Sequence, residues 1–256
     1  MSVPLTAEQL SAELAIRDLT DPAEGRHAVQ LVVDRVVHAL ATRWGCAVRR
    51  CRGDRVVTVE DNYDNLGYPP AAVTREARHT RYVDDGRVLR SHTSAMIPPA
   101  LRALAADPVA DVLLVCPGMV YRRDAIDRHH TGTPHQLDVW RVARRPLTAA
   151  DLRDMITTVL DAVLPGAVGR REPRVHPYTR DGYQVDVAQD GDWLEVGEGG
   201  LAHPDVLAGA GLDPSWCGLA LGLGLDRLLM LVKSIPDIRL LRSSRAEVAA
   251  QGGRRP

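Results

Sequence analysis

The sequence predicts an α+β fold in which an antiparallel β-sheet is flanked by helices. The strand-like segments are short, and turns join them as often as helices do, unlike the regular βαβ alternation of a parallel sheet. Two apolar segments, Val112–Cys116 and the alternating Leu137, Val139 and Val142, enclose a polar turn. No repeat or convincing linker interrupts the 256 residues, so we expect one structural domain.

Two helices are expected before the first strand. Thr6 and Gln9 have the spacing of a capping box, which predicts a helix over residues 6–19. The segment Asp21–Glu24 combines an acid at the N-cap with proline in the first turn, and we expect it to start the second helix. Valines then recur at helical spacing until Gly45, which is expected to end that helix.

Short strands and helices alternate in the middle of the chain. The alternating segments Arg55–Val59 and Tyr82–Leu89 predict strands, and Pro98–Ala106 predicts a short helix. After the polar turn, Thr148 is expected to cap an amphipathic helix whose buried face extends to Val163.

The C-terminal part returns to strands. They are expected at Tyr183–Val187, Trp193–Val196 and Gly218–Leu221. Gly222-Leu223-Gly224 then leads into a final helix over Leu225–Lys233.

The composition excludes several classes of protein. Apolar residues make up 45% of the chain and charged residues 25%, as in an ordinary soluble globular protein. The net charge of −1 excludes a polybasic protein. The four cysteines form no Cys-x-x-Cys pair, which argues against a zinc ribbon or a redox motif. Neither a signal peptide nor an apolar stretch of about 18 residues is visible, so we expect a cytoplasmic protein without membrane contact.

The polar turn is the most informative stretch of the chain. It contains Tyr121–Asp124, Asp127, His130, His135-Gln136 and Asp138. Two strands can hold such side chains rigidly over one surface, which suits recognition of a phosphate and a small zwitterion. A solvated hairpin tip is the alternative interpretation.

Several segments together carry a family resemblance. They are Leu89–Ser94, Tyr121–Asp124 with His130 and His135–Asp138, Trp193–Val196, Gly200–Pro204, Gly222–Arg227 and Ile235–Arg239. Through them, from about Asp61 to Ser243, the chain resembles the catalytic domain of class II aminoacyl-tRNA synthetases, and most closely the α subunit of phenylalanyl-tRNA synthetase. The resemblance implies an antiparallel sheet, ATP-dependent activation of an amino acid, and a homodimer.

The resemblance also assigns residues to ATP. Arg122 matches the motif 2 arginine, which holds the α-phosphate and the carboxylate, and Arg227 matches the motif 3 arginine near the ATP tail. Both are expected to be catalytic, because activation brings two anions together and a guanidinium group grips oxyanions while it stays charged. Asp124 and His130 are expected beside ATP. Glu195 is expected to bind Mg²⁺, an ion that combines one or two carboxylates with phosphates.

Four further matches surround the amino acid. Asp138 and Gln136 can accept hydrogen bonds from its ammonium group. His92, Ser94 and Arg122 can donate to its carboxylate.

The side-chain pocket departs from the family. Phenylalanyl enzymes place two phenylalanines around a proline, whereas this chain has His176 and Tyr178 around Pro177. Leu219-Ala220-Leu221 replaces a Phe-Ala-Phe run, although Ala220 leaves the same gap. A pocket built to hydrogen-bond rejects apolar side chains sharply. We therefore expect a substrate other than phenylalanine, with a polar or aromatic-polar side chain.

Other interpretations have less support in the sequence. His129, His130 and His135 suggest zinc, yet no fourth ligand matches. Gly222-Leu223-Gly224 lacks the third glycine of a dinucleotide fingerprint. Glu195 can also be a strand-edge charge. A non-catalytic sensor of an amino acid or nucleotide is the alternative function, and a sensor of an amino acid alone has little need for phosphate ligands.

We divide the chain into residues 1–60 with a degenerate motif 1 region, a catalytic core at 61–246, and a flexible tail at 247–256. Neither the long N-terminal coiled coil of the family nor an anticodon-binding module is recognisable, which favours a stand-alone paralogue. The acceptor of the acyl group is expected to be a tRNA, a carrier-protein thiol or a small amine. Basic clusters at 49–52 and 170–174 can contact an RNA backbone or an acidic partner, or form solvated faces.

Overall fold

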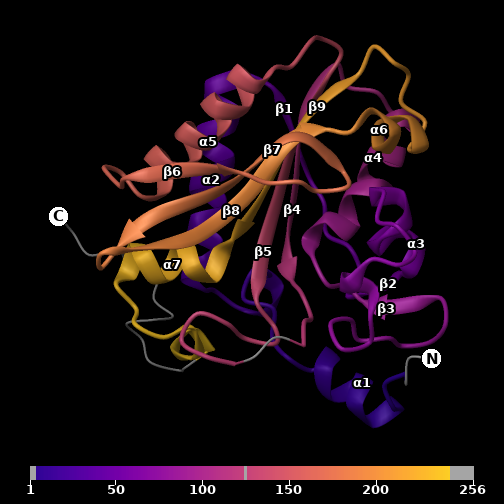
Figure 1. Ribbon diagram of the computed structural model, residues 1–256, viewed down its shortest axis with the longest axis vertical. Helices are drawn as coiled ribbons and strands as arrows, with labels where there is room; N and C mark the ends of the chain where they lie inside the picture. The colour runs from indigo at the N-terminus through magenta and orange to yellow at the C-terminus, as the bar shows by residue number, and fades with distance from the viewer. Residues whose placement is uncertain (1–3, 124–125, 243–256) are drawn as a thin grey trace.

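A seven-stranded β-sheet forms the centre of the computed structural model, which describes residues 4–123 and 126–242 (Figure 1). Its strands are β1 (Ala47–Arg50), β4 (Asp111–Met119), β5 (His135–Ala143), β6 (Gly169–Pro173), β7 (Thr179–Gln189), β8 (Asp192–Ala202) and β9 (Cys217–Gly224). They lie in the order β1-β4-β5-β9-β8-β7-β6, and every pair is antiparallel except β1 with β4. The predicted α+β fold is confirmed. The parallel edge strand β1 was not predicted.

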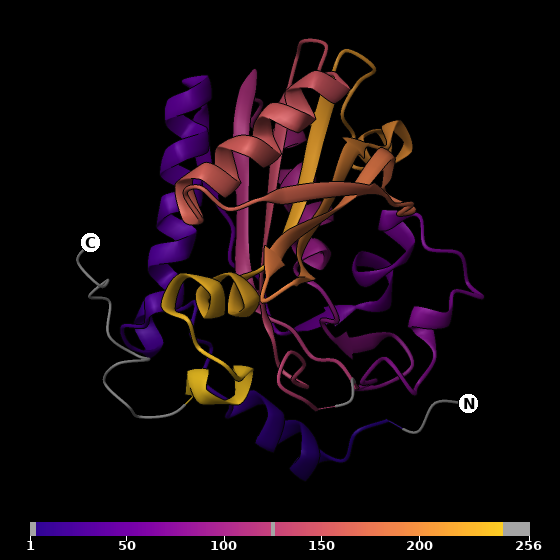
Figure 2. The same ribbon diagram turned by 60° about the vertical axis from the view of Figure 1, so that its left-hand side comes forward.

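Three helices cover one face of this sheet (Figures 1 and 2). They are α2 (Ala28–Trp44), α5 (Ala149–Val163) and α7 (Leu225–Lys233). Their apolar residues recur every three or four positions, so each helix buries one stripe. Val36 and Leu40 of α2, for example, pack in a core that also contains Leu113 and Val139 of the sheet. None of the helices in the described ranges has the length and apolar content of a membrane span.

Part of the opposite face of the sheet is also covered. The covering elements are α4 (Ile97–Ala106), α6 (Pro204–Gly209) and the 3-10 helix η4 (Thr93–Met96). The second core on this side contains Leu101 of α4 and Trp140 of β5. The remainder of this face carries polar side chains from β5 and β8.

The N-terminal helices differ from the prediction in their boundaries. The capping box at Thr6 is present, but helix α1 (Ala7–Leu14) ends earlier than residue 19. Asp21 caps only the 3-10 helix η1 (Pro22–Glu24). Gly25 follows with φ at 108°, a conformation that no helix can continue through. Helix α2 therefore starts three residues later, with the His27 side chain as its N-cap.

The predictions for α4 and α5 are confirmed closely. In α5 the Thr148 hydroxyl accepts the Asp151 N–H, and the Asp151 carboxylate accepts the Thr148 N–H in return. The predicted strands at Arg55–Val59 and Tyr82–Leu89 form only a small two-stranded sheet of β2 (Val56–Thr58) and β3 (Arg87–Leu89). It lies outside the main sheet, beside α3 (Val59–Asn62) (Figure 1). Helix α3 in turn contacts the 3-10 helix η2 (Asp64–Leu66), and the 3-10 helix η3 (Val73–Arg75) follows along the chain.

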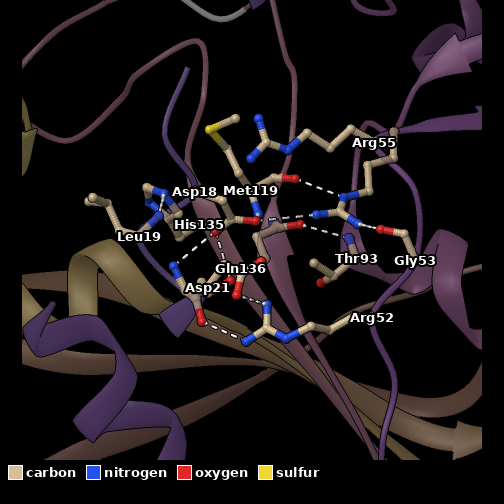
Figure 3. A network of polar contacts seen from close by, with 12 residues as sticks. Asp18, Leu19, Asp21, Arg52, Gly53, Arg55, Thr93, Met119, His135 and Gln136 are labelled. Carbon is tan, nitrogen blue, oxygen red and sulfur yellow. Dashed lines mark hydrogen bonds and ion pairs between the residues drawn. The ribbon is translucent and has the colours of Figure 1, made fainter. Parts of the chain in front are cut away.

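A buried polar network ties the segment after α1 to the sheet (Figure 3). One oxygen of Asp18 accepts the Met119 N–H at 3.0 Å and lies 3.6 Å from the Arg90 guanidinium. The Leu19 N–H donates to Nε2 of His135 at 3.1 Å. These contacts join residues 18–19 to the end of β4 and the start of β5. The β4–β5 connection, which carries the polar turn, therefore leaves the sheet from a fixed base.

Candidate active site

Most of the site residues expected from the sequence lie on the half-covered face of the sheet. Asp138 and Gln136 come from β5, Ala220 from β9 and Glu195 from β8. The loops at the ends of these strands supply the others. Asp124 lies outside the described residues, and its expected role at ATP stays a prediction.

Asp138 is the most buried acid of this group, with 3% of its surface exposed. Its carboxylate accepts hydrogen bonds from the Thr93 hydroxyl at 2.7 Å, the Ser94 hydroxyl at 3.0 Å and Nε1 of Trp140 at 3.2 Å. Burial raises the pKa of Asp138, although these donors oppose the shift. Because Ser94 donates to Asp138, it presents a lone pair to a ligand rather than the proton expected from the sequence.

Gln136 and His92 lie beside this carboxylate. The amide oxygen of Gln136 accepts the Thr93 N–H at 3.3 Å. The His92 ring stacks on Tyr68 with centroids 5.7 Å apart. Burial, with the Arg122 charge, lowers the pKa of His92 to about 3, so its imidazole is neutral at pH 7. Both of its ring nitrogens are buried and lack a partner of full hydrogen-bond geometry in the described structure, although the Asn62 backbone lies near enough to act on the pKa of the ring. Such atoms normally mark a missing ligand or water.

Arg122 is half-buried just beyond the end of β4. Its N–H bonds the Gly132 carbonyl across the loop at 2.9 Å, and its Nε donates to the Ser91 carbonyl at 3.0 Å. Its charge acts on the pKa values of His92, Tyr68 and Glu198, so the guanidinium lies among these three groups. No carboxylate among the described residues forms an ion pair with it. The guanidinium is therefore held through its Nε by one carbonyl oxygen, that of Ser91, and keeps its charge for a ligand.

Arg227, Glu195 and His130 form a second cluster, at the start of α7. The Arg227 guanidinium donates to the Glu195 carbonyl at 3.0 Å and lies 3.8 Å from its carboxylate. Its other end donates to Nε2 of His130 at 3.1 Å, while Nδ1 of His130 lies 2.9 Å from both oxygens of Asp127. This chain fixes Arg227 by neutral acceptors on two sides. The structure thus brings together three of the residues expected at ATP, Arg227, Glu195 and His130, while Arg122 lies beside the first group.

A bulge in β8 brings a further acid to the same face. Asp186 of β7 pairs with Glu195, but the preceding residue pairs with Gly197, so Val196 is an extra residue. In a regular strand residues 195 and 198 would face opposite sides. Here Val196 is buried among the helices, and Glu195 and Glu198 share the site face. Burial, and then the nearby Glu198 charge, raise the pKa of Glu195.

Glu198 is a site residue that the sequence did not reveal. Its carboxylate forms a short hydrogen bond with Nε2 of His176. Burial favours the neutral acid, but His176, Arg174 and Arg122 together hold the pKa of Glu198 below its usual range. The carboxylate is therefore charged at neutral pH. His176 and Tyr178 lie together as expected, with ring centroids 5.5 Å apart.

Trp140 is a second residue that the sequence did not reveal as part of the site. In the sequence it looks like an ordinary core residue of β5. The indole is fully buried and stacks on Tyr178, with centroids 6.1 Å apart and planes 24° apart. Its partner in β9 is Ala220. Two of the residues expected to line the substrate pocket, Tyr178 and Ala220, therefore lie next to the indole of Trp140.

The three histidines that suggested zinc do not come together. His135 is buried, and its Nδ1 bonds Asp226 at 2.9 Å, whereas His130 is exposed and bonds Asp127. Within the described ranges, no group of three or more His, Cys, Asp or Glu side chains is arranged to hold a metal ion.

Comparison with known proteins fits this geometry. Residues 13–251 match the family described as tRNA synthetases class II core domain (F). The chain belongs to the class II aminoacyl-tRNA synthetases. The α subunit of phenylalanine–tRNA ligase from Prochlorococcus marinus is 35% identical to this synthetase over 233 residues, covering 89% of this chain and 67% of that protein. The corresponding subunit from Nostoc punctiforme is 32% identical over 250 residues, covering 94% and 73%.

A solved structure shows the same fold. A pyrrolysyl-tRNA synthetase from Desulfitobacterium hafniense superposes with a TM-score of 0.65 and 19% identity, over 94% of this synthetase and 82% of that chain. The family, its relatives and the fold together make this synthetase a ligase with a class II catalytic core.

Proposed function

We propose that the synthetase activates an amino acid other than phenylalanine with ATP, forming an aminoacyl-adenylate. In this reaction a carboxylate oxygen of the amino acid attacks the α-phosphorus, a new C(O)–O–P bond forms, and the bond to pyrophosphate breaks. Both reactants are anions, so the site must supply positive charge where the new negative charge develops. The amino acid is then transferred to an acceptor, either a tRNA, a carrier-protein thiol or a small amine.

One observation carries the proposal. Arg122 and Arg227 are 105 positions apart in sequence, yet they act on neighbouring carboxylates, Glu198 and Glu195. Each guanidinium is fixed by hydrogen bonds to carbonyl or imidazole acceptors, which do not neutralise its charge. Two such charges at one surface suit a nucleotide triphosphate.

The residues present also fit Mg²⁺ brought with ATP. Glu195 is half-exposed beside Arg227, and Glu198 lies on the same face. One or two carboxylates are what a protein usually adds to a phosphate-bound Mg²⁺, and a larger cage of protein ligands is not required. The ion would supply charge stabilisation at the phosphate oxygens. Glu195 remains our proposed ligand.

We propose that the remaining site residues bind the amino acid. His92, Ser94, Gln136 and Asp138 would hold the ammonium and carboxylate groups of the amino acid. His176, Tyr178 and Ala220 would line its side chain. The homodimer, the cytoplasmic location, the stand-alone role, and the division at residues 60 and 246 also remain proposals.

Pyrophosphate exchange tests this function. The wild-type protein should incorporate labelled pyrophosphate into ATP in the presence of one amino acid from a panel. Arg122→Ala should lower the exchange rate by about 100-fold or more, as loss of a transition-state contact does. Arg43→Ala is the matched control, since Arg43 forms a surface ion pair with Asp154 on the helical side. An absence of exchange with every amino acid would favour a non-catalytic binding protein instead.

A further inference from the structure

We propose that Trp140 and the Glu198–His176 pair restrict the synthetase to an amino acid with a short side chain that carries a hydrogen-bond donor. The proposal deepens the function above and rests on it. Trp140 would set the size limit of the pocket, and Glu198 with His176 would set its polarity. A hydroxyl, an amine or a primary amide would all meet this requirement.

Trp140 occupies the space that a long substrate side chain would need. The indole lies next to Ala220 in strand register and stacks on Tyr178. Its Nε1–H is bonded to the Asp138 carboxylate, so the ring is anchored at its polar edge as well as on its face. Tyr68 packs on Tyr178 from another side, with centroids 6.2 Å apart. A fully buried ring that stacks on Tyr178 and bonds to Asp138 cannot rotate away without disturbing the core.

The groups that we propose to contact the substrate lie close together and are polar. Gly222 in β9 pairs with Glu198 on one side and with Asp138 on the other, so the two acids lie on the same face, separated by a residue without a side chain. Adjacent strands are about 4.8 Å apart, which places the two backbones about 10 Å apart. A Cβ atom added at Gly222 would lie 3.8 Å from the nearer Asp138 oxygen. A ligand with its ammonium group near Asp138 therefore reaches Glu198 with only a short side chain.

The Glu198–His176 pair lacks part of its hydrogen bonding. Nδ1 of His176 is buried and has no partner in the described structure, although its Nε2 is bonded to Glu198. The other oxygen of Glu198 lies 3.7 Å from the Arg174 side chain, which is too long for a hydrogen bond. A donor on the substrate would satisfy one or both atoms. An apolar side chain would leave a charged carboxylate and an imidazole nitrogen unpaired, which a site of this kind rejects strongly.

The first test uses the wild-type protein and isosteric pairs of amino acids in pyrophosphate exchange. Threonine is compared with valine, asparagine with leucine, and serine with alanine, and 2,3-diaminopropionate and phenylalanine complete the panel. We expect the polar member of at least one pair to exceed its partner at least about 100-fold in kcat/KM, with phenylalanine below both. The comparison of serine with 2,3-diaminopropionate separates a hydroxyl from an amine. A higher kcat/KM for phenylalanine, leucine or valine would overturn the proposal.

The second test enlarges the pocket. Trp140→Leu should raise kcat/KM for phenylalanine at least tenfold relative to wild type, while the KM for ATP changes less than twofold. Trp193→Leu is the control, since Trp193 lies at the far end of β8 and packs on Arg170. Glu198→Gln should reduce the preference for the polar member of the best pair at least tenfold. If Trp140→Leu does not fold, the wild-type panel still decides the question.

Failure of the proposed function can be told apart from failure of this proposal. If no amino acid supports exchange, calorimetry with the sulfamoyl-adenosine analogues of serine and phenylalanine measures the pocket without the reaction. Tighter binding of the seryl analogue supports the size and polarity limits. Equal or tighter binding of the phenylalanyl analogue, or binding of neither, overturns them.

Discussion

The N-terminus of α2 makes the stability of the synthetase depend on pH. The His27 side chain is 1% exposed, and its Nδ1 accepts the Val29 N–H at 3.2 Å. Its Nε2 lies 3.2 Å from the Leu241 carbonyl and can only donate to it. These two bonds require the neutral imidazole. Burial lowers the pKa of His27 from 6.5 to about 4.

The sign and size of the effect follow from the two pKa values. The unfolded chain binds a proton at His27 near pH 6.5 and the folded protein only near pH 4, so the folded state loses stability as pH falls through this window. Each pH unit is worth about 1.4 kcal/mol, so acidification to pH 5, about 1.5 units, costs about 2 kcal/mol. Below pH 4 the loss of unfolding free energy reaches its limit of about 3 kcal/mol, because the two pKa values differ by about 2.5 pH units.

Urea unfolding of wild type and His27→Asn at pH 7 and pH 5 measures this contribution. Asparagine is a good N-cap and does not titrate, so the variant keeps the Val29 bond and loses the pH dependence. It also loses the bond to the Leu241 carbonyl, but that loss is the same at both pH values and cancels when the two are compared. We expect the difference in unfolding free energy between the two proteins to move by about 2 kcal/mol in favour of the variant at pH 5. His38→Asn, an exposed position on the same helix, should produce no such movement. A difference that is the same at both pH values would refute the reasoning.

Three further predictions concern the site. His130→Ala removes the acceptor 3.1 Å from Arg227, so steady-state exchange kinetics should show a severalfold higher KM for ATP and a smaller change for the amino acid. In Asp138→Asn an amide replaces the carboxylate that accepts hydrogen bonds from three donors. Urea unfolding should therefore show a free energy of unfolding that is lower by about 2 kcal/mol. Gly222→Ala places a methyl group no closer than 3.7 Å to its neighbours, so it should keep the melting temperature but raise the KM for the amino acid. Gly200→Ala places its Cβ 2.7 Å from a threonine and should lower the melting temperature.

Each of these has an outcome that contradicts it. An unchanged KM for ATP in His130→Ala would mean that the imidazole does not hold Arg227 in place. Full stability of Asp138→Asn would mean that the donors have other partners. If Gly222→Ala and Gly200→Ala melted at the same temperature, the space beside Gly222 would not be open.

Local patterns in the sequence predicted most of the helices, because their signals lie within one turn. The capping box of Thr148 and Asp151 and the left-handed Gly45 at the end of α2 both appear as expected. The start of α2 was wrong for a reason that is also local. Asp21 satisfies the rules for an N-cap, but Gly25 adopts a positive φ and breaks the chain of helical residues.

The candidate site was predictable only where a family motif fixes a residue. Arg122 and Arg227 could be named from their motifs. Glu198 could not, because strand periodicity places it opposite Glu195, and only the extra residue Val196 reverses that. The pairing of Trp140 with Ala220 depends on the register of two strands far apart in sequence, which no local pattern records.

Two kinds of arginine can be distinguished by their hydrogen-bond acceptors. One kind stabilises the fold, and the other is proposed to bind ligands. Arg141 is almost fully buried and forms two bonds with the Asp111 carboxylate at 2.9 and 2.7 Å, so its charge is already matched. Arg90 is matched by Asp18 and by backbone carbonyls. Arg122 and Arg227 instead use carbonyl or imidazole acceptors. Among the described residues, the one carboxylate that forms an ion pair with either of them is that of Glu195, 3.8 Å from Arg227. A closer acid would stabilise either side chain in the free protein, but it would have to be displaced before a phosphate could bind. Neutral acceptors fix the position of the charge and leave it available, which is what binding an anion requires.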